Sequence, residues 1–256
     1  MLRYIQCLLL GALCFLNLPA SLANTPLQSP PNVTGYQQTI NALIYYHDSG
    51  QYDRDLTTVY TQATTYLAKH LHDSKKRPAI VFDIDETTLS DWPMMIKTQF
   101  HNEPATMDKW INEASATTIK PALALYRYAQ EQHVAVFFIT GRAEHLRAAT
   151  IKNLHKGGYH NWAGLYLRPD GDRQQESVTE YKSHIRQAIT QRGYHIVLNV
   201  GDQYSDLCGG NAQQTVKLPN PFYYLPGCSV KQVCQWAPAE PRYQQRWAAM
   251  CRHIYS

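Results

Sequence analysis

Charged residues are scarce in this sequence, and no long run of one sign occurs. Asp, Glu, Lys and Arg make up 17% of the 256 residues, and the densest basic spot is Lys75-Lys76-Arg77. Proteins that bind nucleic acid polymers usually carry a basic stripe or tail, so we expect no partner of that class. Glycine and proline, at 13 and 14 residues, are too few for a collagen-like or low-complexity chain. The 44% of apolar residues suffices for a folded core.

Long apolar segments are absent except near the start of the chain. Met1-Leu2-Arg3 is a short basic start, residues 5–18 are almost wholly apolar, and Ser21-Leu22-Ala23 places small residues where a signal peptidase needs them. This pattern predicts a signal peptide of residues 1–23, cleaved after Ala23, and therefore export to a periplasm or secretion. No later segment approaches the roughly 18 unbroken apolar residues of a spanning helix, so we expect no membrane association after cleavage.

Cysteine is rare beyond this leader, and no Cys/His set has zinc-finger spacing. The four later cysteines are Cys208, Cys228, Cys234 and Cys251. An even number of cysteines in an exported chain permits disulfides, while free buried thiols are the alternative. Cys228 and Cys234 lie close together in sequence and are the first predicted pair.

Apolar periodicity predicts strands that alternate with helices. The predicted strands are 79–82, 134–139, 164–167, 195–200 and 215–218, and the predicted helices are 56–71, 104–117, 121–132, one that ends near Lys156, and 178–191. This alternation implies an α/β fold, a Rossmann-like three-layer sandwich with a mostly parallel sheet. Residues 24–40 are predicted to form a flexible lead-in, and residues 41–256 one domain with a small helical cap at about 90–132.

Two aspartates, Asp83 and Asp85, follow the first predicted strand in the segment Asp83-Ile84-Asp85-Glu86-Thr87. In open α/β sheets, ligands bind at the carboxyl ends of the strands. A pair of carboxylates in one loop can supply a nucleophile and a general acid/base. The alternative, a helix cap or a solvated turn, explains one Asp but not both.

Further polar residues follow two other predicted strands. Asp202 and Asp206 come after one, and Thr140 comes after another. Two acidic loops at one sheet edge would repel unless a cation lies between them, and hard oxygen ligands of this kind suit Mg²⁺. A metal-free cluster would have to hold a proton or a lysine. A hydroxyl from Thr140 and an ammonium from Lys182 are groups that bind the oxygens of a phosphoryl group.

The motifs taken together resemble the haloacid dehalogenase superfamily of phosphatases. Within it, the sequence is most similar to secreted acid phosphatases of bacterial class B/C type and to plant acid phosphatases and vegetative storage proteins. The motifs are Asp83–Ser90, Phe138–Arg142, Tyr181-Lys182-Ser183, Asn199–Leu207 and Lys217–Tyr224. The similarity runs from about residue 45 to residue 226.

The resemblance implies a role for each matching residue. Asp83 would attack phosphorus and form an aspartyl-phosphate, and Asp85 would protonate the leaving alcohol and later activate water. The other implied roles are phosphate binding by Thr140, Gly141 and Lys182, Mg²⁺ binding by Asp83, the main-chain carbonyl of Asp85 and Asp202, and support from Asp206, which would hold a metal-bound water or orient Lys182. The implied function is an exported Mg²⁺-dependent phosphomonoesterase, of acid phosphatase or 5′-nucleotidase type. Its substrates would be small phosphomonoesters, nucleoside monophosphates among them.

Two alternatives remain open, a phosphotransferase and a non-catalytic secreted binding or storage protein of the same fold. The presence of Asp83 favours an enzyme over a storage role. The spacing leaves no room for a large cap, because Thr140 follows Asp83 by only 57 positions. The site is therefore expected to be open, with Trp92 either stacking on the substrate at its entrance or belonging to the core. A homodimer is a further expectation left open.

Overall fold

A computed structural model of the chain describes residues 35–73, 75–101, 103–171, 176–225 and 227–228. The predicted signal peptide lies outside these residues. Residues 36–40, assigned above to the lead-in, instead begin helix α1 (Tyr36–Asp48), in which Ile40 is buried. The folded domain therefore starts earlier than residue 41. Among the helices in the described part of the chain, none combines the length and the apolar composition that a membrane span requires.

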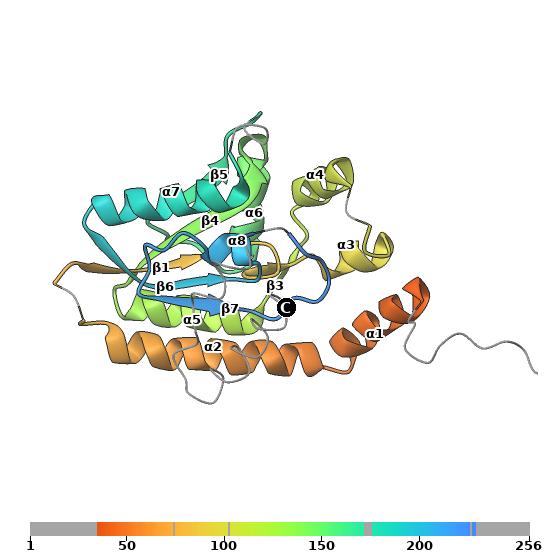
Figure 1. The fold of residues 1–256 in the computed structure, drawn as a ribbon, viewed down its shortest axis with the longest axis horizontal. Coiled ribbons are helices and arrows are strands. Elements are labelled where there is room, and N and C mark those ends of the chain that lie inside the picture. Colours follow the sequence, from red (N-terminus) through yellow and green to blue (C-terminus); the bar gives the residue numbers. More distant parts are fainter. Residues whose placement is uncertain (1–34, 74, 102, 172–175, 226, 229–256) are drawn as a thin grey trace, which may run out of the picture. The chain divides into compact units, whose positions relative to one another are not determined.

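Five parallel strands form the central sheet in the order β5-β4-β1-β6-β7 (Figure 1). They are β1 (Arg77–Phe82), β4 (Ala135–Ala143), β5 (Gly164–Arg168), β6 (Tyr194–Gly201) and β7 (Gln214–Lys217). A second, antiparallel pair consists of β2 (Leu89–Ser90) and β3 (Thr117–Thr118). The predicted α/β fold with a mostly parallel sheet is confirmed, and each predicted strand is present. β4 runs further than predicted, because its end pairs with β5 at Ala143 and Arg168.

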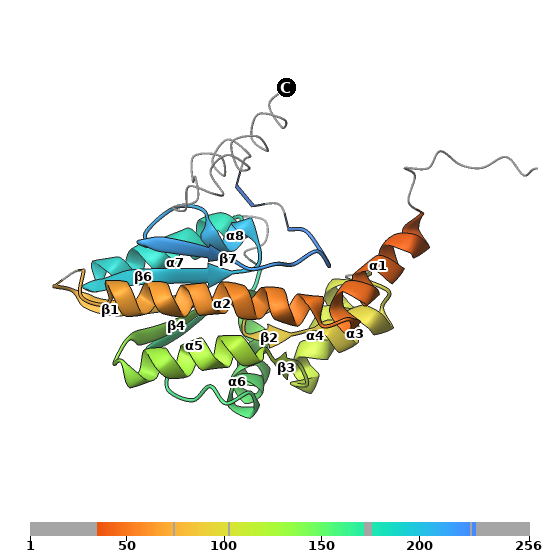
Figure 2. The ribbon, with the colours of Figure 1, turned by 90° about the horizontal axis from the view of Figure 1, so that it is seen from below.

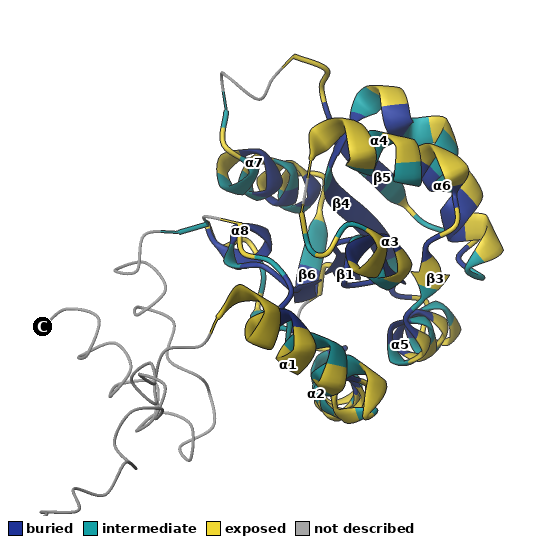
Figure 3. Ribbon diagram, turned by 90° about the vertical axis from the view of Figure 1, so that its right-hand side faces the viewer, coloured by how far each residue is buried: buried dark blue, intermediate teal, exposed yellow. Residues whose placement is uncertain are grey.

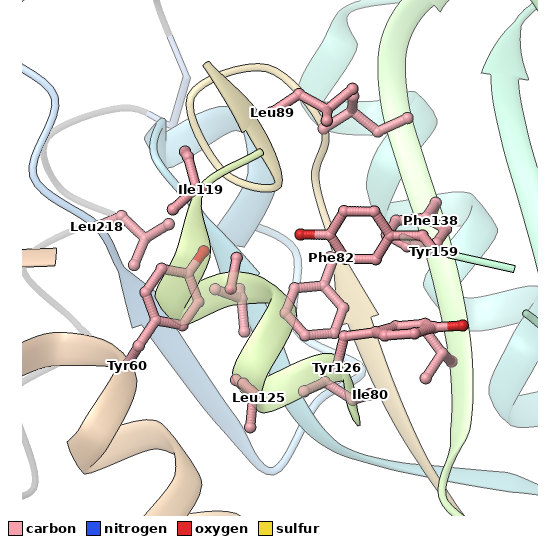
Figure 4. Close-up of a cluster of buried hydrophobic side chains, with 14 of the residues drawn as sticks. Tyr60, Ile80, Phe82, Leu89, Ile119, Leu125, Tyr126, Phe138, Tyr159 and Leu218 are labelled. Atoms are coloured by element: carbon pink, nitrogen blue, oxygen red, sulfur yellow. The ribbon is translucent and has the colours of Figure 1, made fainter. Parts of the chain in front are cut away.

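Helices cover both faces of this sheet (Figures 1 and 2). They are α2 (Gln51–His70), α5 (Lys120–Glu131), α6 (Arg147–Lys156, after a 3₁₀ turn at Glu144–Leu146) and α7 (Val178–Gln191). Side chains alternate along β1, so that Ile80 and Phe82 pack with α2 and α5, while Ala79 and Val81 pack with α7. Figure 4 shows the first of these clusters, with Tyr60 among its members. The three-layer arrangement follows from this alternation.

The cap is smaller than predicted. Helices α3 (Trp92–Lys97) and α4 (Pro104–Glu113) lie beyond the carboxyl ends of the strands rather than over the faces of the sheet, and α4 contacts α6 (Figure 1). Helix α5, included above in a cap of residues 90–132, instead packs beside α2 and contributes Leu125 to the core. α4 ends before residue 117, because Ala114 takes a left-handed conformation with φ of 49°.

The strand order reverses direction at β1, since β4 and β5 extend to one side and β6 and β7 to the other. Ligands of open α/β sheets bind at the carboxyl edge beside such a switch point. Figure 3 shows the buried strands β1, β4 and β6 surrounded by helices. Most of the predicted site residues lie at the carboxyl ends of these three strands or directly after them, Lys182 lies on α7, and Trp92 begins α3.

Candidate active site

Asp83 lies directly after β1 and is still held by the sheet, because its amide donates to the carbonyl of Val200 at 3.0 Å. Its carboxylate is buried and accepts a hydrogen bond from Nζ of Lys182 at 2.5 Å. Lys182 is buried on α7, which begins with a capping box formed by Ser177 and Glu180. Nζ also donates to Asp206 at 2.6 Å. One buried ammonium therefore joins the predicted nucleophile to a second carboxylate.

Three buried carboxylates converge at the carboxyl edge. Asp83, Asp202 and Asp206 each offer an oxygen, and these oxygens lie within 4.8 Å of one another. Burial and the charges of Asp206, Asp202 and Asp85 raise the pKa of Asp83 despite the opposing charge of Lys182. Burial and the charge of Asp206 likewise raise the pKa of Asp202. When ionised, the three carboxylates and the Lys182 ammonium leave two negative charges, which one divalent cation would balance.

The residues present fit a hard divalent cation, since all three donors are carboxylate oxygens. Of the predicted metal ligands, the structure brings Asp83 and Asp202 together, with Asp206 beside them. The side chain of Asp206 packs directly against Gly201. Position 201 therefore requires glycine, because a Cβ there would overlap the Asp206 side chain. The carboxylate of Asp85 faces elsewhere, and metal binding by its main-chain carbonyl stays a prediction.

Asp85 pairs with Arg142, a residue for which no role is predicted above. Nε of Arg142 donates to both oxygens of Asp85, at 3.0 and 3.1 Å, and Nη2 donates to Oδ1 at 2.6 Å. Burial opposes ionisation of Asp85, but the charge and hydrogen bonds of Arg142 outweigh it, and the pKa of Asp85 is lowered. The buried Arg142 therefore favours the ionised form of this candidate general acid/base.

Thr140 and Gly141 lie near the end of β4, the strand that pairs with β1. Thr140 is fully buried, and its Oγ1 accepts a hydrogen bond from the amide of Arg142 at 3.2 Å. Gly141 lies beside Val178 at the start of α7. The structure thus places both residues at the predicted edge, and their binding of phosphate stays a prediction.

Trp92 begins α3 and belongs to an aromatic cluster. Its ring stacks on His47 of α1, with centroids 3.7 Å apart and planes 11° apart. Phe222 and Phe100 lie 5.1 and 5.9 Å from it. Trp92 is half-buried, so it packs against the core and is partly accessible as well.

A family model described as HAD superfamily, subfamily IIIB (Acid phosphatase), matches residues 21–226. The chain belongs to this family. Acid phosphatase 1 of Solanum lycopersicum is 35% identical over 178 residues, which cover 68% of this chain and 69% of the relative. Vegetative storage protein 1 of Arabidopsis thaliana is 33% identical over 186 residues, or 71% of this chain and 68% of the relative. The class C acid phosphatase from Bacillus anthracis with tungstate bound has a TM-score of 0.62 at 25% identity, and the match covers 75% of this chain and 87% of that one.

These similarities confirm the predicted resemblance to acid phosphatases of the HAD superfamily. The clustered carboxylates lie at the carboxyl edge of the sheet rather than at the opposite one. A hollow of about 770 Å³ at that opposite edge is lined by residues such as Arg77, Ala135 and Tyr194 and has no carboxylate in its lining.

The loop between Asp83 and Asp91 of this acid phosphatase family member is held by buried groups without a predicted role. Glu86 accepts hydrogen bonds from the Tyr52 hydroxyl at 3.0 Å and from the amide of Asp91 at 2.6 Å, and burial raises the pKa of Glu86 to about 7. The hydroxyl of Tyr60 donates to the carbonyl of Thr87 at 2.6 Å. Helix α2 therefore anchors the loop that carries Asp83 and Asp85. The Asp-x-Asp-Glu-Thr motif contains Glu86, but only the fold brings the two tyrosines to it.

The disulfide differs from the predicted pair. Cys208 is joined to Cys228, with Cα atoms 5.9 Å apart, so the predicted pairing of Cys228 with Cys234 is wrong. Proximity in sequence was a poor guide, because the chain after β7 returns to the loop that follows β6. Cys234 and Cys251 lie outside the described residues. Arg186 holds this loop from α7, donating to the carbonyls of Asp206 and Gly210 at 2.7 and 3.0 Å.

Proposed function

We propose that this acid phosphatase family member is a Mg²⁺-dependent phosphomonoesterase that acts through an aspartyl-phosphate on Asp83. The observation that supports this most is the buried cluster of Asp83, Asp202 and Asp206 around Lys182 at the switch point of the sheet. Without a counter-charge, such a cluster costs stability, so its presence favours a role in binding a cation and an anionic substrate.

The proposed reaction has two steps. In the first, an oxygen of Asp83 bonds to phosphorus, the ester P–O bond breaks, and Asp85 gives its proton to the leaving alcohol. In the second, water attacks phosphorus, Asp85 takes a proton from this water, and inorganic phosphate leaves as the Asp83 carboxylate is restored. Lys182, Thr140 and Gly141 bind the phosphoryl oxygens and keep them oriented.

Mg²⁺ would be held by Asp83, Asp202 and the main-chain carbonyl of Asp85, with Asp206 beside it. When bound, it supplies positive charge that offsets the charge of the carboxylates and of the phosphoryl group. Hard carboxylate oxygens support this choice of metal, and the formal excess of two negative charges supports its valence.

We propose small phosphomonoesters as the substrates, and nucleoside monophosphates among them, which would make the enzyme a 5′-nucleotidase as well. The aromatic cluster around Trp92 supports a leaving group that stacks, since the Trp92 side chain is half-buried beside the loop that carries Asp83 and Asp85.

Export to a periplasm or secretion is proposed from the leader of residues 1–23. A nucleic acid polymer and a membrane are not proposed as partners, and a homodimer is the one proposed self-association.

A non-catalytic storage or binding protein is the second candidate. A relative named as a vegetative storage protein supports it at 33% identity. Asp83, Asp85 and Lys182 are all present here, which favours catalysis. A phosphotransferase would use the same residues, with an alcohol in place of water in the second step.

The test is release of inorganic phosphate by the full chain from p-nitrophenyl phosphate, nucleoside 5′- and 3′-monophosphates, phosphotyrosine and sugar phosphates. Each substrate is measured with Mg²⁺ and with excess chelator. We expect turnover that chelation stops and Mg²⁺ restores, with the highest kcat/KM for an aromatic leaving group. Absence of turnover with every substrate, from folded protein that binds Mg²⁺, would favour the storage or binding candidate.

A further inference from the structure

The segment after β7 lies beside the predicted metal ligand Asp202. We call residues 218–225 the strap. It begins where the amide of Leu218 donates to the carbonyl of Gly201 at 2.9 Å. Near its other end, the amide of Leu225 donates to Oε1 of Gln203 at 3.1 Å. The strap therefore contacts the residues directly before and directly after Asp202.

Two amide groups contact the same oxygen of Asp202. Nδ2 of Asn220, on the strap, donates to Oδ2 at 2.6 Å, and Nε2 of Gln203 donates to it at 2.8 Å. The other oxygen, Oδ1, accepts from the hydroxyl of Thr87 at 3.1 Å. Hydrogen bonds from three directions set the rotation of the Asp202 carboxylate before any ligand binds. Such outer partners orient metal-binding carboxylates and sustain their affinity.

The disulfide fastens the chain beyond the strap. Cys228 is bonded to Cys208, which is buried directly after α8 (Tyr204–Leu207). Gly227 lies with its backbone against α8, since a Cβ at this position would come within 2.5 Å of the amide nitrogen of Ser205. The loop closed by the disulfide contains both β7 and Asn220, so the bond limits how far Asn220 can move from Asp202.

We propose that Asn220 and Gln203 are positioning residues that orient Asp202 for a divalent cation, and that the Cys208–Cys228 disulfide keeps the strap in place for this purpose. The inference rests on the proposed function because it requires Asp202 to bind metal. It gives a role to the motif Lys217–Tyr224, to which none is assigned above, and it makes metal affinity depend on the oxidation of two cysteines.

The first experiment measures Mg²⁺ binding to the full chain by titration calorimetry, with the metal alone and no substrate. Asn220→Ala is expected to raise the Kd for Mg²⁺ by about 10- to 100-fold. Asn220→Leu, which fills the space without a donor, is expected to have the same effect. Asn112→Ala is the matched control, because Asn112 is exposed on α4 and donates to a helix carbonyl. At saturating Mg²⁺, the kcat of the Asn220 variants is expected to stay within a few-fold of wild type, which a merely misfolded protein would not show.

A Kd for Asn220→Ala and Asn220→Leu within about twofold of the control would overturn the positioning role. If Asn220→Leu alone kept wild-type affinity, packing rather than hydrogen bonding would be the function of Asn220, and the inference would again be wrong. Lack of Mg²⁺ binding by the wild type is a separate result, since it would contradict the proposed function itself.

The second experiment tests the disulfide with the double variant Cys208→Ser/Cys228→Ser. Its Kd for Mg²⁺ is expected to lie between those of wild type and Asn220→Ala, and wild type treated with reductant is expected to match it. Circular dichroism at the titration temperature shows whether the double variant is folded. If it is not folded, the measurement on reduced wild type replaces it. Unchanged affinity in reduced wild type, or in a folded double variant, would overturn the role of the disulfide.

Discussion

Lys182 and Arg142 each pair with a carboxylate at the carboxyl edge of the sheet, but their surroundings differ. Lys182 contacts two carboxylates, Asp83 and Asp206, within a cluster that carries excess negative charge. Burial opposes its charge, yet Asp206 and Asp83 raise the pKa of Lys182 above its usual value. In the described part of the chain, Asp85 is the one carboxylate within hydrogen-bond distance of Arg142. Removing these two cations therefore has different consequences.

For Lys182, the expected consequence is a loss of stability. Lys182→Met leaves Asp83 and Asp206 buried without their cation, which typically costs about 3–5 kcal/mol of unfolding free energy. Urea unfolding in excess chelator measures this cost, and added Mg²⁺ is expected to recover part of it. Lys152→Met, at an exposed position of α6, is the control and should lie within about 0.5 kcal/mol of wild type. A loss at Lys182 no larger than at Lys152 would contradict the account of the cluster.

For Arg142, the expected consequence is a change in pH dependence. Arg142→Gln removes the charge that lowers the pKa of Asp85, while burial, which raises this pKa, remains. Asp85 must be protonated to act as the acid, so activity is lost as the pH rises through its pKa. The alkaline limb of the kcat/KM profile is therefore expected to move to higher pH in Arg142→Gln. The exposed Arg127→Gln serves as control, and a limb that stays in place in both variants would remove Asp85 from the role of acid.

At the scale of elements, the disulfide closes a loop that holds β7 and the strap. Its cysteines are 20 residues apart in sequence, and closing a loop of this length typically contributes about 3 kcal/mol to stability. Reduction is expected to lower the unfolding free energy by about this amount, measured by urea unfolding with and without dithiothreitol. The Cys208→Ser/Cys228→Ser variant should show the lower value without responding to dithiothreitol. A wild-type protein of equal stability in both buffers would contradict the prediction.

The sequence predicts those elements best in which apolar spacing extends over several turns or a full strand. The apolar positions of α2 and the buried run of β1 carry that signal, and both are found. Helices α3 and α8 span only six and four residues, too few for a period to emerge. The apolar face of α5 indicates that the helix is buried but not which element covers it, so the sequence does not show where the cap ends.

The candidate site follows a similar rule. Asp83, Asp85, Thr140 and Asp202 could be found because they follow predicted strands, and Lys182 because it matches a family motif. The contacts of Tyr52 with Glu86 and of Asn220 with Asp202 join residues far apart in the chain, and no local pattern reveals them. The same reason explains the missed disulfide.

At the scale of the whole domain, His145 joins the cap to the sheet. Its Nδ1 lies 2.7 Å from Asp170, after β5, and its Nε2 lies 3.1 Å from Asp108 on α4. Both ring nitrogens can donate only when the imidazole is protonated. The hydrogen bonds to Asp170 and Asp108 raise the pKa of His145. The stabilisation of the fold by these two hydrogen bonds is thus fully present below the unfolded-state pKa of histidine, about 6.5, and is lost as the pH rises through the folded-state pKa of His145.

His145→Gln is therefore expected to lower the Tm most at about pH 5 to 6 and to have no effect at about pH 9. Calorimetry across this range measures the difference, with the exposed His72→Gln as control. A Tm difference that does not vary with pH would show that His145 contributes by packing alone.

The most direct test of the proposed function is to locate the phosphoryl group during turnover. Wild-type protein is mixed with a phosphomonoester and Mg²⁺, quenched in acid within milliseconds, digested, and examined by mass spectrometry. We predict phosphorylation of Asp83 in the wild type and neither phosphorylation nor phosphate release in Asp83→Asn. A phosphoryl group on another residue, or phosphate release at the wild-type rate by folded Asp83→Asn, would contradict the assignment of Asp83 as the nucleophile.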